Sequence, residues 1–188
     1  MKRAAMQALH QRGASLLEVM VAMLLLSFGM LALGTLLAYA IQSPKLSGYH
    51  AIAVNLAASH VERIRANPGA FGNGAYSLAL TYDGTFTDLA SQQKRCNYPA
   101  CTPSSLADMD NTTDSQAVRV ALPAGGMLLQ CDPAPCTASS YGNLWIVWQE
   151  PQTHEDIKLS SSDNCPAEVT GTYNIDPKPR CLYLRFKV

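Results

Sequence analysis

The stretch GASLLEVMVAMLLLSFGMLALGTLLAYAIQ, residues 13–42, decides the fold of this 188-residue chain. From Val19 to Ile41 it contains no charged residue over 23 positions. A helix of that length is about 35 Å long at 1.5 Å per residue, and the hydrocarbon core of a bilayer is about 30 Å thick. The stretch therefore predicts a helix that can cross a membrane once.

Basic residues precede this run, and no comparable cluster directly follows it. Lys2, Arg3 and Arg12 lie before the run. The positive-inside rule therefore puts the N-terminus in the cytoplasm and everything after Gln42 outside. We expect the larger part of the chain to be exported.

The junction at Gly13 does not fit an ordinary secretory signal, whose apolar core is about 7 to 15 residues long and is followed by its cleavage site. Here the change in composition comes before the apolar run. The segment from Gly13 to Val19, with glycine first and Glu18 five residues later, resembles the class III leader junction of type IV prepilins. The resemblance implies that a prepilin peptidase cuts after Gly13 and methylates the new amino terminus at Ala14, where phenylalanine is the usual residue of the family.

Glu18 is the one acid near the start of the run, and its position has a physical explanation. If cleavage leaves an amine at Ala14, Glu18 lies one helical turn away, in the first turn, where the helix dipole favours a carboxylate. In the pilin family this glutamate is thought to neutralise the amino terminus of a neighbouring subunit during assembly. Pairing within one helix stays open, and a plain signal anchor is the alternative to the whole interpretation.

The helix is expected to continue beyond the membrane as an amphipathic segment over residues 43–68. Its apolar stripe is formed by residues at spacings of three and four, and Asn67-Pro68-Gly69 predicts its end. His60 on this stripe is expected to be a packed core histidine. The stripe comprises Ala53, Leu56, Ala57, His60 and Ile64.

The remainder, residues 69–188, predicts a small antiparallel sheet that covers the stripe, which makes the fold class α+β. Thr113 to Ala121 is ambiguous between helix and strand. Thr113 with Gln116 fits a capping box, and we favour a helix there. The expected strands are 76–82, 126–131, 143–149 and 182–188.

Six cysteines lie in the part expected to be outside, and their even number indicates disulfides, with 15 possible pairings. Local pairing is the simplest arrangement, because proline turns within the first two pairs bring their ends together. A zinc site is disfavoured, since four residues separate each of these pairs and no histidine accompanies them. The expected pairs are Cys96 with Cys101, Cys131 with Cys136, and Cys165 with Cys181.

Other functional classes find little support in the composition. Lysine plus arginine equal aspartate plus glutamate at 14 each, so nothing indicates a nucleic-acid partner. No metal, cofactor or catalytic constellation is expected. The acids at 108, 110 and 114 are interpreted as a solvated loop, because the glycine and closing glutamate of an EF-hand are missing.

The resemblance extends to PilV-type minor pilins through three segments: 26–33, 55–68 and 122–126. It implies a type IV pilin fold with a cytoplasmic leader (1–13), a transmembrane and filament-core helix (14–42), an amphipathic helix (43–68) and a periplasmic globular domain (69–188). The implied role is priming of pilus assembly and a place at the pilus tip, with connections to twitching motility and cell adhesion. Implied partners are the prepilin peptidase, other minor and major pilins, the inner-membrane assembly platform and a tip adhesin.

Three alternatives remain beside this role. A minor pseudopilin of a type II secretion system carries the same leader. A membrane-anchored adhesin or binding module can be built on the same helix. An anchored enzyme is the least favoured, because the four histidines form no Ser/His/Asp arrangement that the sequence reveals.

Overall fold

The computed structural model describes residues 15–87, 89, 95–150, 165–172 and 179–188. The chain divides into two compact units, Met1–Pro44 and Lys45–Val188, and each is treated by itself. The predicted cleavage and methylation positions, Gly13 and Ala14, lie outside the described residues, as do the leader bases.

The described part of the first unit is helical, within α1 (Leu16–Ala66). The 23 residues Leu16–Ala38 form a candidate membrane span with a mean hydropathy of 2.4. Two polar side chains in the span are satisfied by the helix itself: Ser27 Oγ donates to the Met23 carbonyl at 2.7 Å, and Thr35 Oγ1 to the Ala32 carbonyl at 2.8 Å. Such back-bonding removes most of the cost of placing a hydroxyl in lipid.

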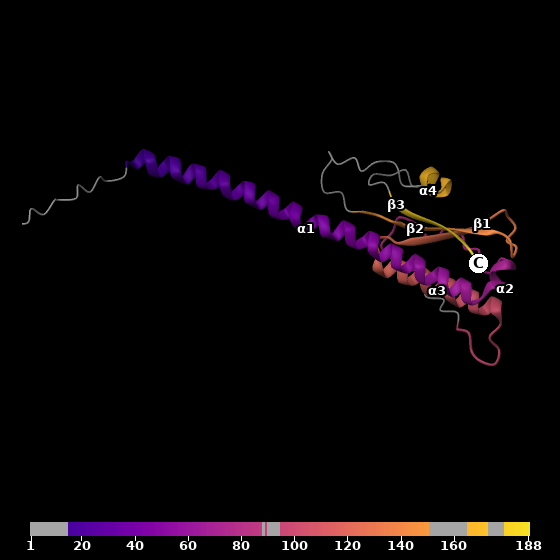
Figure 1. Cartoon of the computed structure of the whole chain (residues 1–188). Coiled ribbons are helices and arrows are strands. Elements are labelled where there is room, and N and C mark those ends of the chain that lie inside the picture. Colours follow the sequence, from indigo (N-terminus) through magenta and orange to yellow (C-terminus); the bar gives the residue numbers. More distant parts are fainter. Residues whose placement is uncertain (1–14, 88, 90–94, 151–164, 173–178) are drawn as a thin grey trace, which may run out of the picture. The chain divides into compact units, whose positions relative to one another are not determined.

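The second unit contains the rest of α1 and six further elements (Figure 1). They are α2 (Pro68–Gly72), α3 (Pro103–Ala121), β1 (Gly126–Asp132), β2 (Tyr141–Trp148), α4 (Ala167–Thr172) and β3 (Arg180–Lys187). Three of the four predicted strands, at 126–131, 143–149 and 182–188, correspond to β1, β2 and β3.

The three strands form one antiparallel sheet in the order β1-β2-β3. Its inner face packs on the predicted apolar stripe of α1, because side chains of both elements belong to one buried cluster. α1 ends at Ala66, directly before Asn67-Pro68, as proline geometry predicts. The α+β fold class expected from the sequence is thus confirmed. Members of the cluster include Ala53, Ala57, Ile64, Met127, Leu129, Leu144 and Ile146.

The strand predicted at 76–82 is wrong as a regular strand. The segment is extended and makes one isolated bridge, Leu78 with Leu129. Thr81 interrupts the ladder, because its hydroxyl accepts the Met127 N–H at 2.8 Å and its carbonyl accepts from Arg119 Nη2 at 2.7 Å. The Thr81 N–H still donates to the Met127 carbonyl at 2.9 Å, but these side-chain bonds replace the reciprocal backbone bond from the Met127 N–H to the Thr81 carbonyl.

The predicted helix near 113–121 is confirmed, but its start is wrong. α3 begins ten residues earlier, at Pro103, with Thr102 as its N-cap. The Thr102 hydroxyl accepts from the Ser105 N–H at 3.1 Å, and the Ser105 hydroxyl accepts from the Thr102 N–H at 2.7 Å. Serine here takes the role that glutamate or glutamine usually has in a capping box, with proline at the first helical position.

The structure contains three disulfides, and they join the pairs favoured by local spacing: Cys96–Cys101, Cys131–Cys136 and Cys165–Cys181. The first two close loops of five-residue separation, and the third closes one of 16. The third also fixes β3 to the start of α4, since Cys181 lies in β3 and Cys165 precedes α4.

We expect the Cys165→Ser/Cys181→Ser double variant to lose about 3 kcal/mol of unfolding free energy, because this bridge closes the longest loop. The matched Cys96→Ser/Cys101→Ser variant should lose about 2 kcal/mol on the same chain-entropy model. Urea unfolding of the full chain in detergent measures both. An equal or reversed order would contradict the expectation, and peptide mapping without reduction tests the pairing itself.

Candidate functional site

The N-terminal helix presents an apolar surface with one acid at its start. Glu18 lies in the first turn of α1, and its N–H donates to the Ser15 carbonyl at 2.9 Å. Its side chain is exposed. The carboxylate is therefore located where the helix dipole favours a negative charge and where a cation can approach it.

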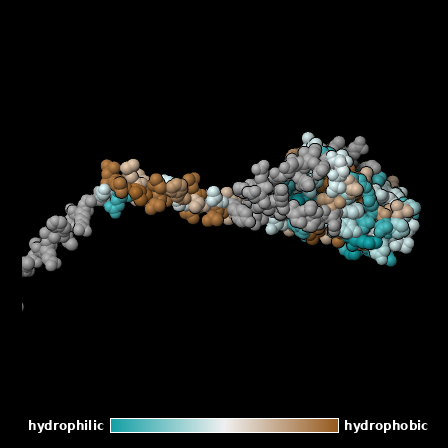
Figure 2. All heavy atoms as spheres, turned by 90° about the horizontal axis from the view of Figure 1, so that it is seen from above, coloured by the Kyte–Doolittle hydropathy of each residue, from teal (hydrophilic) through white to brown (hydrophobic). Residues whose placement is uncertain are grey.

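Large apolar side chains are exposed along the whole segment, and Figure 2 shows them on the face that it draws. None of the membrane-span window is buried within the structure. A helix that is apolar all round needs a lipid or protein environment, because exposing it to water carries the full hydrophobic cost. The segment can thus serve as a membrane anchor and as a helix that packs among other helices. Its exposed residues include Leu17, Met20, Leu24, Phe28, Leu31 and Leu37.

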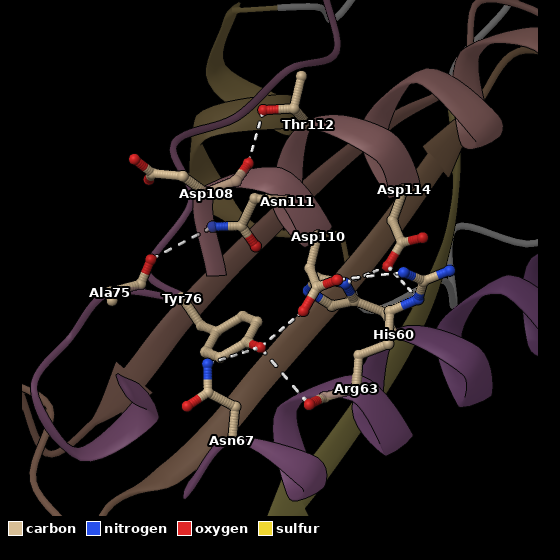
Figure 3. A network of polar contacts seen from close by, with 10 residues as sticks. All are labelled: His60, Arg63, Asn67, Ala75, Tyr76, Asp108, Asp110, Asn111, Thr112 and Asp114. Atoms are coloured by element: carbon tan, nitrogen blue, oxygen red, sulfur yellow. Dashed lines mark hydrogen bonds and ion pairs between the residues drawn. The ribbon is translucent and has the colours of Figure 1, made fainter. Parts of the chain in front are cut away.

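In the second unit, a buried polar pair connects α1 to α3 (Figure 3). Nδ1 of His60 lies 2.7 Å from Oδ2 of Asp114, and the His60 side chain is fully buried. Because a carboxylate only accepts, Nδ1 is the protonated nitrogen. Nε2 of His60 is buried and finds no hydrogen-bond partner among the described residues. The sequence-based expectation of a packed core histidine is confirmed.

A second set of bonds extends this pair into a network. Arg63 Nη1 donates to Asp110 Oδ1 at 3.1 Å, and Arg63 Nε lies 3.5 Å from Asp114 Oδ2. Tyr76 OH donates to Asp110 Oδ2 at 2.8 Å and accepts from Asn67 Nδ2 at 3.4 Å. One face of α3 thus receives α1 and the segment that follows α2.

The surroundings change the acid–base behaviour of two members of the network. Burial, together with the hydrogen bond to Asp110, raises the pKa of Tyr76 to about 12. The hydrogen bond to Asp110 and the charge of Asp114 raise the pKa of Arg63. Both shifts favour the protonated form of the side chain. In the network, Tyr76 is therefore a neutral phenol and Arg63 a charged guanidinium, and both face the carboxylate of Asp110.

Interpreting residues 108–114 as a solvated acidic loop was wrong. The three acids lie within α3, and Asp110 and Asp114 are 4% and 6% exposed. Asp110 and Asp114 lie four positions apart and therefore share one helix face, which is turned toward α1. Asn111 on the same helix is also buried, and its Nδ2 donates to the Ala75 carbonyl at 3.4 Å.

The contacts of this network hold elements of the fold together. Groups of three or more His, Cys, Asp or Glu positioned to hold a metal ion do not occur within the described ranges. The His60 side chain is fully buried, so the imidazole is not open to solvent, and Asp114 is 6% exposed. What the network can do is fix the register of α1 against α3.

The residues of the network are visible in the sequence, but nothing in the sequence shows which of them are in contact. His60 and Asp114 lie 54 positions apart, and Tyr76 and Asp110 lie 34 apart. The i, i+4 spacing of the two acids would have indicated a shared face only after 103–121 had been recognised as one helix.

Comparison with known families gives two matches. A model described as type IV pilin Tt1218 matches residues 36–112, and a model described as the prokaryotic N-terminal methylation motif matches residues 9–34. The second range contains both Gly13 and Glu18. No curated protein and no solved structure matches the chain.

The fold and these two matches define the class of protein, a pilin-type subunit with a methylation motif before an apolar helix. Together the two matches support a type IV pilin with a class III leader. Leader and helix support membrane anchoring and incorporation into a pilus. The motif implies processing by a prepilin peptidase and assembly with other pilins, and the family is one of structural proteins.

We expect Asp114→Ala to destabilise the folded second unit by about 2 to 4 kcal/mol, because it leaves a buried imidazole without its partner and Arg63 with one carboxylate fewer. Urea unfolding of the full chain in detergent measures the change. Glu62→Ala is the control, since its exposed pair with Arg65 is worth less than about 1 kcal/mol. Equal effects of the two substitutions would show that the buried pair adds no stability.

We also expect an alkaline loss of stability that depends on Tyr76. The folded pKa of about 12 lies above the ordinary value of 10, so the contribution is complete below pH 10 and is lost as pH rises toward 12. The loss amounts to about 3 kcal/mol. Unfolding free energies measured from pH 9 to 12 should show this slope in the wild type. Tyr76→Phe should have a shallower slope, and an unchanged slope would refute the assignment.

Proposed function

We propose that this pilin is a minor subunit that helps to start pilus assembly and contributes to the pilus tip. The observation that supports this most directly is the methylation-motif match at the start of an exposed apolar helix, because that combination suits a subunit inserted first in a membrane and then in a filament. Three disulfides in the second unit favour a low-copy subunit over an abundant major pilin, which usually carries one.

The parts of the chain then have distinct roles in this proposal. Residues 1–13 are the cytoplasmic leader, 14–42 the transmembrane and filament-core helix, 43–68 the amphipathic helix, and 69–188 the periplasmic globular domain. Before assembly the protein crosses the inner membrane once, and afterwards it belongs to the pilus. With residues 69–188 in the periplasm, the six cysteines lie in an oxidising compartment. This location is consistent with three disulfides.

Partners follow from the same proposal. The prepilin peptidase removes the leader and methylates Ala14, and the inner-membrane assembly platform receives the mature subunit. Other minor and major pilins pack against its apolar helix, and a tip adhesin is a further partner. Twitching motility and adhesion are the cellular processes that the subunit then serves.

Gene deletion in the native host tests the role directly. A strain without this chain should form markedly fewer pili, and the wild-type gene should restore them. Normal piliation together with a defect in protein secretion would favour a minor pseudopilin of a type II secretion system. Normal piliation with lost surface attachment would favour an adhesin.

For processing, we expect a mature chain that begins at Ala14 with a methylated amine. Gly13→Val should accumulate as an uncleaved form in the inner membrane, because the bulky side chain occupies the position next to the cut. Intact-mass measurement of the protein from its host decides the point. A start at Met1, or a start beyond Ile41, would contradict the proposal.

For Glu18, we expect the Glu18→Ala variant to insert, to be cleaved and to fold, because the change makes an exposed helix position more apolar. Incorporation into sheared filaments should fall, since the amine of a neighbouring subunit loses its counter-charge. The comparison is made at equal membrane levels, with Thr35→Ala as a control substitution in the same helix. Unchanged incorporation would remove Glu18 from the assembly contacts.

A further inference from the structure

The outer face of the sheet carries aromatic and amide side chains, called here the aromatic strip: Gln130, Tyr141, Asn143, Trp145 and Tyr183. Strand register brings them together, because Gln130 pairs with Asn143, and Trp145 with Tyr183. Leu144 and Phe186, which alternate with them along the strands, belong to the buried cluster that contains residues of α1. The strip therefore lies on the face directed away from α1.

One ring of the strip presents a surface on which a ligand can stack. The centroids of Trp145 and Tyr183 are 5.1 Å apart and their planes are inclined by 33°, so Trp145 supports one side of the Tyr183 ring. In the part of the sheet that the structure describes, β3 is an edge strand, and no strand covers the other side of that ring. Tyr183 is accordingly 36% exposed.

The two amides beside this ring retain hydrogen-bonding capacity. Tyr183 OH donates to Asn143 Oδ1 at 2.9 Å, which leaves the two N–H donors of Asn143 Nδ2 for another acceptor. Gln130 Nε2 donates to Glu168 Oε1 at 2.9 Å, which leaves Gln130 Oε1 as an acceptor. Because one end of each amide is already bonded, the other end is oriented before a ligand arrives.

The charged side chains around the strip balance one another. Arg185 Nη2 donates to Asp132 Oδ2 at 3.0 Å, and Glu168 is the second acid of this face, opposite in charge to Lys187. Two cations therefore lie on the same surface as two carboxylates. Arg185 and Lys187 also lie 4.3 Å and 5.4 Å from the centroid of the Tyr141 ring. A surface without a charge excess is complementary to an uncharged ligand.

The size of the open area favours a narrow ligand over a protein. Val169 of α4 packs with Val147 and Cys181 at one end of the outer face, and the open part extends from Trp145 to Tyr141. Four residues of strand span about 13 Å, and three strands about 4.8 Å apart span about 10 Å. That footprint is several-fold smaller than the roughly 800 Å² that each partner buries in a standard protein interface.

These features together match the chemistry of a sugar chain. A pyranose ring has an apolar C–H face bordered by hydroxyl groups, so its recognition needs an aromatic ring with hydrogen-bond donors and acceptors beside it. Aromatic side chains supply apolar contact at low entropic cost, and a few placed polar groups fix the orientation of the ligand. The strip supplies a ring, donors and acceptors in one line along the strands.

We propose that the aromatic strip binds an extended, uncharged glycan, with one pyranose ring stacked on Tyr183 and hydroxyl groups bonded to Asn143 Nδ2 and Gln130 Oε1. The inference deepens the adhesive part of the proposed function and rests on it for its cellular meaning. Binding by the purified chain does not depend on pilus assembly, so the two can fail separately.

The test uses the full chain purified in a polyoxyethylene detergent, which has no sugar head group. Isothermal titration calorimetry measures the affinity for cellohexaose and chitohexaose, two uncharged extended glycans, and for hexagalacturonate, which is anionic. Tyr183→Ala removes the ring, and Asn143→Asp removes both N–H donors while it keeps an acceptor for Tyr183. Tyr98→Ala is the matched control, since it makes the same change at a tyrosine that is 95% exposed outside the sheet.

We expect at least one of the two uncharged glycans to bind, and Tyr183→Ala and Asn143→Asp each to weaken that binding roughly tenfold or more. Tyr98→Ala should bind like the wild type. Urea unfolding verifies that the variants fold, and Asn143→Asp decides the question if Tyr183→Ala does not. Binding of neither uncharged glycan, or equal affinities of the folded strip variants and the wild type, would overturn the proposal. Binding of hexagalacturonate alone would assign the face to a polyanion and overturn it as well.

Piliation separates this inference from the proposed function. In a deletion strain that produces Tyr183→Ala at wild-type membrane levels, pilus number should equal that of the wild type. A loss of pili there would assign the strip to a contact between proteins and overturn glycan binding. Normal piliation in the deletion strain itself would refute the role in assembly, and calorimetry would still decide the glycan site.

Discussion

An apolar helix that has no protein surface to cover it is the constraint on which the rest of this molecule depends. Each large apolar side chain left in water forgoes about 1.5 to 3 kcal/mol, and the span Leu16–Ala38 presents many of them. Only lipid or other helices can remove that cost. The methylation motif and the acid at Glu18 are both consistent with a helix that is transferred from one apolar environment to another.

The second unit is subject to a different constraint. The part of α1 that belongs to it must pack in one register against a small three-stranded sheet. Apolar contacts from Ala53 to Ile64 supply much of the attachment, but small side chains specify register poorly. The His60–Asp114 pair and the Arg63–Asp110 pair add bonds of defined geometry across α1 and α3. Buried ion pairs contribute more to specificity than to net stability in some proteins, and this network is well placed for that role.

Disulfides supplement this small core at three places on its periphery. Two close short loops and the third joins β3 to the start of α4, which in turn covers one end of the outer sheet face. The uncovered end carries Tyr141, Tyr183, Arg185 and Lys187. The six-residue helix α4, through Val169, covers the other end together with Tyr82 and Ala124.

The sequence by itself determined the apolar span, the amphipathic stripe of α1, its end before Pro68 and three of the strands, because each depends on local periodicity or on proline geometry. The matches at 9–34 and 36–112 cover the span, the stripe and the end of α1, and the three strands lie beyond them. Tertiary structure alone decided the rest. Thr81 keeps one backbone bond to Met127, but Arg119 takes its carbonyl, so the regular strand does not form. Asp110 and Asp114 are buried because α3 starts at Thr102-Pro103 and turns both toward α1. A partner 54 residues away gives no local signal, so the environment of His60 could not be deduced from the stretch around it.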